Sequence, residues 1–303
     1  MNVITGGLGF IGNELVRQLA HGDDVAILDN KNRIAPHIKD LAAFPVYEAD
    51  ITDHETTAKV IRELKPRAVF HLAAIHYIPE CNSNPERTLR VNVEGTMGVL
   101  KACSAAGVEH LLFASSGAVY ADSPQPLTES SPVAPVDIYG WSKLFAEELC
   151  LWHAHQTGLR VTLCRFFNNY GPRETNRHII PEIIEQLKSG NRLQLGNTTP
   201  RRDYIHTADC ARALRLLAKL PPQSTQTVNV ASGHHASVDE LILWMGEILG
   251  RKLEVVTDPT RFRKADKQVQ VADVTLLKKL GWQPQMELRQ GLADLLRFEG
   301  LLK

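Results

Sequence analysis

The sequence predicts an α/β fold, in which a doubly wound parallel sheet carries a smaller, interleaved C-terminal substrate domain. Short β-rich runs alternate with longer helical stretches through the first 167 residues, and this alternation is typical of parallel βαβ units. After residue 168 the order of elements becomes less regular. The chain has 303 residues, of which 44% are hydrophobic, so it is long enough to bury a large core.

The elements of the first part follow one another in regular order. Strands are expected at residues 1–5, 24–30, 45–50, 68–74, 110–116 and 159–166. Helices are expected at residues 11–21, 52–64, 85–106 and 139–157. Thr52 and Glu55 have the spacing of a capping box at the start of the second helix. Sheets of this kind bind ligands beyond the carboxyl ends of their strands, so a site is expected in the loops that follow them.

The second part contains fewer strands. Segments 177–190, 237–250 and 276–300 predict helices, the last as two short helices around a turn. Residues 192–197 predict a short strand, 201–220 a turn that leads into a helix, and 227–232 a strand that can return to the main sheet. We therefore expect one domain at 1–167, to which 205–232 returns, and a second at 168–204 and 233–303.

Composition and charge exclude several classes of protein. Lys+Arg and Asp+Glu both number 34, and no basic run indicates a nucleic-acid partner. No apolar run reaches the roughly 18 residues that predict a membrane span, and Met1 leads into a strand without a basic leader. We expect no metal site. The cysteines are far apart and form no CxxC pair, which predicts reduced thiols in a cytoplasmic protein: Cys81, Cys103, Cys150, Cys164 and Cys210.

A glycine-rich loop follows the first strand at once. Residues 3–12 read VITGGLGFIG, which places Gly6, Gly9 and Gly12 at GxxGxxG spacing before a helix. Such glycines let the chain turn tightly and let backbone N–H groups approach a pyrophosphate. Asp29 and Asn30 end the second strand about 20 residues later, where a ribose-binding acid belongs. We predict a Rossmann-like dinucleotide site, the alternative being a plain strand–turn–helix with a surface aspartate.

The residues near Asp29 bear on which dinucleotide is bound. A carboxylate accepts hydrogen bonds from a ribose diol and repels a 2′-phosphate, so Asp29 favours NAD over NADP. Lys31 and Arg33 lie close by and could instead pair with a phosphate, which leaves NADP as the alternative. Asp50 and Ile51 follow the third strand and are placed to flank the adenine, although Asp50 could simply start a helix.

The stretch IYGWSK, residues 138–143, places Tyr139 and Lys143 one helical turn apart on the same face. An isolated pair of this kind is usually a surface pair. Here Ser115 and Ser116 end a strand some twenty residues earlier and can meet this helix at the carboxyl edge of the sheet. A nearby ammonium and a positive nicotinamide would lower the pKa of the phenol. We therefore predict a general acid/base beside a hydride acceptor.

These motifs together resemble the extended short-chain dehydrogenase/reductase family, in particular its NAD-dependent nucleotide-sugar epimerases and dehydratases. The resemblance covers almost the whole chain and rests on TGGLGFIG (5–12), HLAA (71–74), NVEGT (92–96), SSGAVY (115–120), YGWSK (139–143), RFFNNYGPR (165–173) and RRDYIH (201–206). It implies that residues 1–167 bind NAD through Gly6, Gly9, Phe10, Ile11, Gly12, Asp29, Asn30, Asp50, Ile51, Leu72, Ala73, Ala74, Asn92, Tyr139 and Lys143.

The resemblance also implies a catalytic set and a nucleotide-diphosphate sugar as substrate. The catalytic residues would be Ser116, Tyr139 and Lys143. Asn168 matches a position that contacts the sugar diphosphate, and Arg202 matches an arginine that binds it. RFRKAD (261–266) resembles a later motif and implies Arg263 as a second such ligand. Guanidinium forks suit a diphosphate, and the alternative for each arginine is a solvated surface charge.

The residues after the catalytic hydroxyl bear on the reaction. In relatives that dehydrate, an Asp-Glu pair stands where this chain has Gly117 and Ala118, and small residues here resemble the 4-epimerases. We expect an NAD-dependent 4-epimerase acting on a UDP-sugar through a transient 4-keto intermediate. The alternatives are a 4,6-dehydratase, a decarboxylase or a 4-keto reductase, with a non-catalytic NAD-binding regulator the least favoured.

The segment AIHYIPEC, residues 74–81, departs from the family pattern. It should approach the sugar ring, so His76 is expected either to contact substrate or to act as a second acid/base, with plain packing as the alternative. The resemblance also implies a homodimer, formed through helices 85–106 and 139–157. Leu149, Trp152 and His153 have helical spacing on one side, but this apolar stripe could equally face the core.

Overall fold

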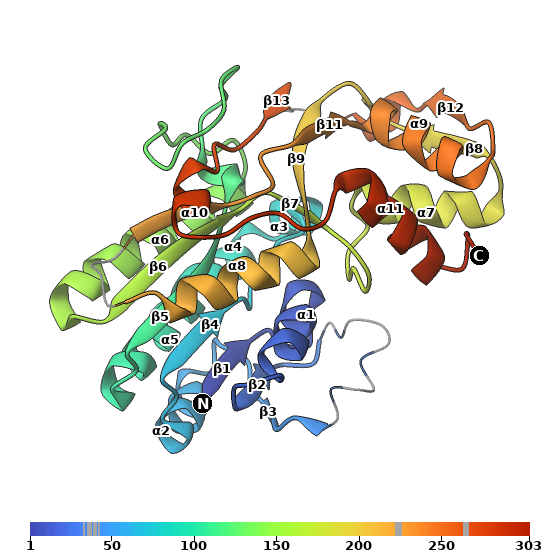
Figure 1. Cartoon of the computed structure of the whole chain (residues 1–303). Helices are drawn as coiled ribbons and strands as arrows, with labels where there is room; N and C mark the ends of the chain where they lie inside the picture. The colour runs from blue at the N-terminus through green and yellow to red at the C-terminus, as the bar shows by residue number, and fades with distance from the viewer. Residues whose placement is uncertain (33, 35–37, 39–40, 42, 222–225, 263–266) are drawn as a thin grey trace.

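The computed structural model describes residues 1–32, 34, 38, 41, 43–221, 226–262 and 267–303. Its larger part is a parallel seven-stranded sheet in the order β10-β6-β5-β4-β1-β2-β3 (Figure 1). These strands are β1 (Asn2–Thr5), β2 (Val25–Asp29), β3 (Val46–Glu48), β4 (Ala68–His71), β5 (His110–Ser116), β6 (Arg160–Phe166) and β10 (Gln226–Val230). The order runs outward from β1 in both directions, so the predicted doubly wound fold is confirmed.

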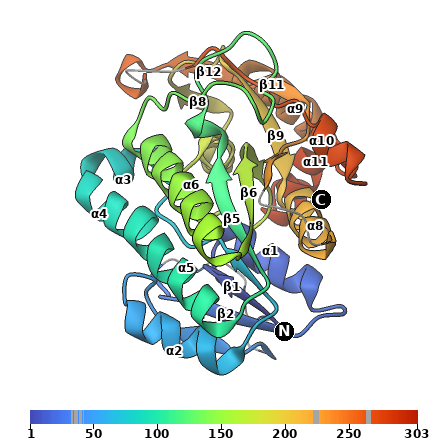
Figure 2. The same cartoon turned by 90° about the vertical axis from the view of Figure 1, so that its left-hand side faces the viewer.

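Helices cover both faces of this sheet (Figure 2). One face packs against α1 (Phe10–Leu19) and α8 (Thr207–Lys219), and the other against α2 (His54–Leu64), α5 (Gly95–Ala106) and α6 (Ile138–Thr157). Successive strand residues alternate between the two cores, as the pleat of a strand requires. Because both faces are covered, the central strands are continuous apolar runs in the sequence.

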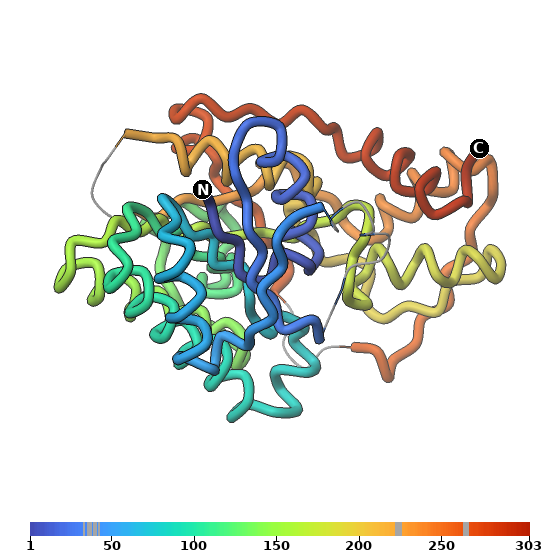
Figure 3. Tube along the Cα trace, turned by 90° about the horizontal axis from the view of Figure 1, so that it is seen from below, coloured from blue at the N-terminus to red at the C-terminus, as the bar shows by residue number. Residues whose placement is uncertain are grey.

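The smaller part lies beside the larger one and carries the C-terminus (Figure 3). It contains a four-stranded sheet and a two-stranded one. Their strands are β7 (Asn168–Tyr170), β9 (Arg201–His206), β11 (His235–Ser237) and β13 (Val269–Gln270) in the first, and β8 (Arg192–Leu195) and β12 (Glu254–Thr257) in the second. α7 (Ile179–Ser189), α9 (Val238–Leu249) and α11 (Leu288–Phe298) share an apolar core with these strands. Within the described residues, no helix combines the length and the apolar character needed to cross a membrane.

Some helix boundaries differ from the predicted ones. α2 is capped by Asp53, whose Oδ1 accepts a hydrogen bond from the Thr56 backbone N–H at 3.1 Å, so the predicted capping box at Thr52 does not form. The predicted helix 85–106 consists of α4 (Pro85–Leu89), the π-helical turn η2 (Arg90–Glu94) and α5. A π-helical turn widens a helix locally and is common at functional sites.

Two further segments differ because tertiary contacts decide their structure. Residues 201–206 form β9 rather than a turn, since β7, β11 and β13 all pair with this strand. The short helix α3 (Ile78–Ser83) was not predicted. By contrast, the helix predicted at 237–250 is confirmed as α9, and Ser237 and Glu240 form a reciprocal capping box at its start.

The chain crosses between the two parts more often than predicted. β10 lies beside β6 at the edge of the main sheet. α10 (Thr275–Lys279) also returns there: Leu277 and Trp282 lie in the core next to α8, and Trp282 Nε1 donates to the Asp209 carbonyl at 3.1 Å. We therefore propose the predicted division into two domains with one change, which assigns 275–282 to the larger domain.

Candidate active site

A cavity of about 810 Å³ lies along the carboxyl ends of the parallel strands and is lined by both parts of the molecule. A doubly wound sheet binds its ligands at this edge. Most of the predicted site residues line this cavity: Gly6, Gly9, Phe10, Ile11, Gly12, Asp29, Asn30, Asp50, Ile51, Leu72, Ala73, Ala74, His76, Ser116, Tyr139, Lys143, Asn168 and Arg202. The fold thus brings predicted cofactor, catalytic and substrate positions into one space.

Asn92 does not line the cavity as predicted. Its side chain is buried, its Oδ1 accepts a hydrogen bond from the Ile75 N–H at 2.8 Å, and its Nδ2 donates to the Ile75 carbonyl at 2.8 Å and to Ser142 Oγ at 2.9 Å. Asn92 therefore ties the segment after β4 to α6, which makes it a positioning residue. Arg263, the second predicted diphosphate ligand, lies outside the described residues.

The glycine loop is packed too tightly for side chains. Gly6 has φ of +71°, and a Cβ there would lie 2.9 Å from the Cα and N atoms of Ala73. A Cβ on Gly12 would lie 2.7 Å from Gly7 Cα and closer still to the Gly6 carbonyl oxygen. The turn can therefore be made only by glycine, which leaves a shallow cradle at the start of α1 where backbone N–H groups can meet a phosphate.

Asp29 is held rigidly at the end of β2. Its Oδ2 accepts a hydrogen bond from the Leu8 N–H at 3.0 Å and its Oδ1 one from the Lys31 N–H at 2.8 Å. Burial raises the pKa of Asp29 despite these hydrogen bonds. The Lys31 ammonium forms an ion pair with Glu48 at 2.7 Å. Arg33 lies outside the described residues.

Asp50 is fixed beside Asp29 at the neighbouring strand end. Its Oδ1 accepts hydrogen bonds from the Thr52 N–H at 2.9 Å and the Thr52 hydroxyl at 2.7 Å, and its Oδ2 one from Asn30 Nδ2 at 2.9 Å. Burial raises the pKa of Asp50, but these hydrogen bonds outweigh it, so the pKa is lowered. The Asp50 carboxylate therefore stays ionised and joins the ends of β2 and β3.

Tyr139 and Lys143 lie on one face of α6, as their spacing predicts. Asp137 caps this helix by accepting a hydrogen bond from the Gly140 N–H at 2.8 Å, which places Tyr139 in the first turn. The Lys143 ammonium is buried, donates to the Ala114 carbonyl at 2.7 Å and lies 6.0 Å from the centroid of the Tyr139 ring. The surface-pair alternative is excluded, because Lys143 is only 3% exposed.

Burial shifts the pKa values of both Tyr139 and Lys143. Burial lowers the pKa of Lys143 to about 8. Burial also raises the pKa of Tyr139, and a hydrogen bond with Ser116 opposes this effect without cancelling it. Without a nicotinamide in the site the pKa of Tyr139 is therefore raised, because desolvation of the phenolate outweighs the hydrogen bond with Ser116. The lowering expected beside a bound, positive nicotinamide stays a prediction.

Ser116 ends β5 and caps the short turn that follows it. Its Oγ accepts a hydrogen bond from the Ala118 N–H at 3.1 Å. Gly117 and Ala118 then line the cavity, and the Gly117 carbonyl accepts a hydrogen bond from Gln270 Nε2 at 2.7 Å. The two positions directly after Ser116 therefore offer the cavity no acid or base.

Several cavity residues were not predicted as site residues. They are Glu174, Arg177, His178, Lys267 and Gln270. Lys267 and Gln270 come from a segment whose spacing in the sequence carries no signal of a site. Glu174 and His178 lie in a loop whose polar character was visible in the sequence, but only the fold places these two side chains next to His76.

The fold and the site together define a dinucleotide-binding enzyme with a tyrosine and a lysine at the centre of its cavity. The model of the NAD dependent epimerase/dehydratase family matches residues 2–231, and the chain belongs to this family. This confirms the predicted family and, because the family depends on NAD, the predicted cofactor.

The similar proteins carry out more than one reaction. GDP-6-deoxy-D-mannose reductase of Pseudomonas aeruginosa is 34% identical over 306 residues, covering 97% of this chain and 95% of that protein. UDP-glucose 4-epimerase of Streptomyces lividans is 33% identical over 303 residues, covering 93% and 91%. The crystal structure of Thermus thermophilus UDP-glucose 4-epimerase in complex with NAD matches with a TM-score of 0.90 and 29% identity, covering 99% of both chains.

Proposed function

We propose that the protein is an NAD-dependent nucleotide-sugar 4-epimerase that acts on a UDP-sugar through a transient 4-keto sugar. The observation that carries this proposal is the pair Gly117 and Ala118, which follows Ser116 on the cavity wall. A hydrogen atom and a methyl group cannot transfer protons, so this position supplies no group for an elimination. The similarity to UDP-glucose 4-epimerases supports the same reaction and the same nucleotide.

Tyr139 is the general acid/base of the proposed reaction. It takes the proton from the C4 hydroxyl. Once the 4-keto sugar has rotated and presents the opposite face of C4 for the return of the hydride, Tyr139 gives the proton back to the same oxygen. Its hydrogen bond with Ser116 places two hydroxyl groups where they can share that proton. The buried Lys143 ammonium lies below the phenol ring and favours the phenolate by its charge.

The residues of the larger part fit an NAD molecule. The cradle made by Gly6 and Gly12 would hold the pyrophosphate, and Asp29, fixed by two backbone N–H groups, would accept hydrogen bonds from the adenosine ribose. The ion pair between Lys31 and Glu48 removes one of the two cations that could have favoured NADP. When bound, NAD accepts a hydride from the sugar and returns it, so it is not consumed.

The residues of the smaller part would bind the nucleotide diphosphate. Arg202 on β9 lines the cavity. Asn168, at the start of β7, also lines it and lies opposite Tyr204 of β9, where its Nδ2 donates to the Asp203 carbonyl at 3.3 Å. A guanidinium group can hold two phosphate oxygens at once. We propose Arg202 as the main diphosphate ligand within the described residues, with Asn168 as a further contact to the sugar diphosphate and His76 nearer the sugar.

A reduction of a 4-keto nucleotide sugar is the second candidate, since the relative at 34% identity is a reductase. The same Tyr139, Ser116 and Lys143 would then protonate a keto oxygen instead of deprotonating a hydroxyl. The two reactions differ in their demand for cofactor, because a reductase consumes one reduced cofactor for each product and an epimerase consumes none.

An NMR time course with the purified protein, NAD and a panel of UDP-, dTDP-, GDP- and CDP-sugars tests the proposal. We expect one UDP-sugar to reach an equilibrium mixture of C4 epimers without net formation of NADH. A keto, deoxy or pentose product would refute the 4-epimerase. If the protein instead turns over a 4-keto sugar with stoichiometric loss of NADH or NADPH, and does not turn over any nucleotide sugar with a C4 hydroxyl, it is the reductase.

We also propose that the protein is a cytoplasmic homodimer. All five cysteines are free and buried, as suits a reducing compartment. The residues of the predicted apolar stripe on α6 do not all face the same way, because His153 is buried whereas Trp152 is 55% exposed. Trp152 joins three other exposed apolar side chains on α6, namely Trp141, Phe145 and Leu151, as a surface for a second copy. Light scattering that gives the mass of a monomer at micromolar concentration would exclude this dimer.

A further inference from the structure

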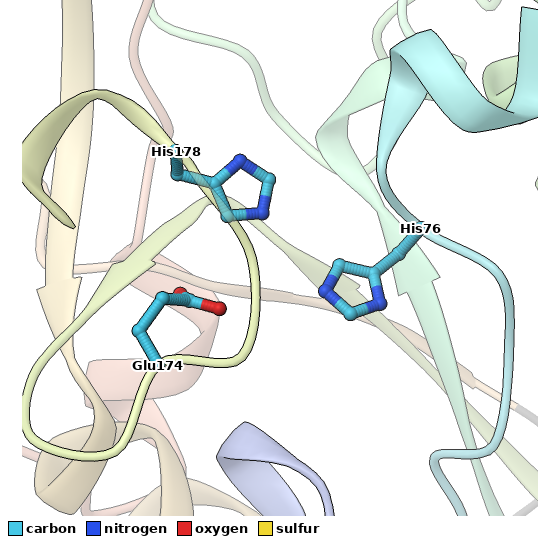
Figure 4. A group of neighbouring side chains, drawn as sticks. All are labelled: His76, Glu174 and His178. Carbon is cyan, nitrogen blue, oxygen red and sulfur yellow. The ribbon is translucent and has the colours of Figure 1, made fainter. Parts of the chain in front are cut away.

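Three side chains with metal-binding groups meet in the cavity (Figure 4). His76 comes from the segment after β4, whereas Glu174 and His178 come from the loop between β7 and α7. Each offers one ligand atom, and these three atoms all lie within 4.8 Å of one another. Figure 4 shows the two imidazole rings and the carboxylate turned toward a common space from two separate segments.

The type of donor in this cluster matches a transition-metal site. Two imidazole nitrogens and one carboxylate oxygen are the ligands of many catalytic zinc sites, and the same combination binds Fe²⁺ in non-heme enzymes. Sites with three protein ligands keep an open position for water or substrate. Ca²⁺ and Mg²⁺ prefer sites made of oxygen atoms alone, so the two histidines argue against both.

The carboxylate of Glu174 is held in place as a metal ligand would be. Its Oε1 accepts hydrogen bonds from the Thr175 N–H at 2.8 Å and the Asn176 N–H at 3.0 Å. Such bonds fix the side chain, and its second oxygen can bind an ion, as is common for metal-binding carboxylates.

His76 lies against the loop that carries the other two side chains. Its Nε2 lies 2.8 Å from Asn176 Nδ2, at hydrogen-bond distance, and metal binding at this nitrogen would replace that contact. The His178 ring stacks beside the His76 ring with centroids 5.8 Å apart, and the ligand atoms of the two rings lie within 4.8 Å of each other.

We propose that His76, Glu174 and His178 bind one divalent transition-metal ion of the Zn²⁺ type, with an open coordination position toward the cavity. The three residues line the same cavity as Tyr139 and Lys143, so the open position faces the space where a substrate oxygen would lie. The sequence led us to expect no metal site. It carries no signal of this one, because residues about one hundred positions apart in the chain supply the ligands. The test of metal binding does not depend on the proposed epimerase reaction, because it is measured without any sugar nucleotide.

The test uses the full chain after chelator treatment, titrated with Co²⁺ followed by visible absorption and with Zn²⁺ followed by calorimetry. We expect one equivalent of either ion to bind, with the d–d spectrum of Co²⁺ bound by nitrogen and oxygen ligands. His76→Gln, Glu174→Gln and His178→Gln should each weaken binding by at least about tenfold, the lower end of what loss of a supporting group costs a metal site. His21→Gln is the matched control, because His21 is exposed and lies outside the cluster.

Each result decides for or against the site. Glu174→Gln preserves the shape of the side chain and its backbone hydrogen bonds, so it tests the ligand even if a histidine variant is unstable. Melting temperature and NAD binding show whether each variant is folded. Absence of a Co²⁺ spectrum in the wild type would overturn the proposal, as would binding that all three variants retain or that His21→Gln reduces equally.

Discussion

Substitution of Gly12 by alanine tests whether the turn after β1 leaves no room for a Cβ at this position. The added Cβ would lie 2.7 Å from Gly7 Cα and even nearer the Gly6 carbonyl oxygen. Both atoms belong to the backbone of the turn, so no flexible side chain can move away. Overpacking of this kind costs about 1–3 kcal/mol. At roughly 2–4 °C per kcal/mol for a chain somewhat smaller than this one, the melting temperature should fall by about 2–12 °C.

The same substitution should weaken NAD binding more than it weakens the fold. The turn can relieve the clash only by moving α1 away from β1, and this displaces the backbone N–H groups that would hold the pyrophosphate. We expect the Kd for NAD to rise at least tenfold, which corresponds to about 1.4 kcal/mol. The assay is calorimetric titration with NAD, together with thermal unfolding with and without NAD.

Gly22→Ala is the matched control. Gly22 lies in the exposed turn after α1, and a Cβ there would meet nothing within 4 Å. This control should leave NAD binding unchanged and either leave the free energy of unfolding unchanged or raise it by about 0.4–1 kcal/mol. If Gly12→Ala keeps the melting temperature and the NAD affinity of the wild type, the loop is less tightly packed than described, and its role as a pyrophosphate cradle is refuted.

Three more predictions concern the charged and catalytic groups. Tyr139→Phe should abolish turnover while the Kd for the nucleotide sugar changes little, and a fully active variant in the NMR assay would remove the acid/base role. Asp29→Ala should weaken NAD more than NADP because the ribose loses its acceptor and a 2′-phosphate loses a repelling charge; equal loss for both cofactors in calorimetry would contradict this. Burial holds the pKa of Lys143 at about 8 in the folded chain, against 10.5 as its ordinary value, so the unfolded chain binds more protons between these pH values and stability rises with pH there. Denaturant unfolding at pH 7.5 and 9.5 should show the wild type gaining about 2 kcal/mol relative to Lys143→Met across this interval, whereas an equal change in both proteins would mean that Lys143 is not desolvated.

Local patterns along the chain were sufficient for the elements and motifs that depend on neighbouring residues. The alternation of apolar runs and amphipathic stretches was enough to predict the parallel sheet, because each strand and helix follows from local periodicity. Gly6, Gly12 and Asp29 could be assigned to a dinucleotide site for a similar reason, since a short βαβ unit contains the whole pattern. The pair Tyr139 and Lys143 likewise needed only one helical turn.

Packing of the folded chain was needed to establish which distant segments meet and which charges are desolvated. Asn92 is turned inward by the backbone of Ile75, although its motif suggested a cofactor contact. The pKa of Tyr139 is raised because burial outweighs its hydrogen bond with Ser116. His76 and His178 share one space because β4 and β7 end at the same cavity, and no local pattern links residues so far apart. Burial and long-range proximity are properties of the packed chain, and spacing along the sequence does not record them.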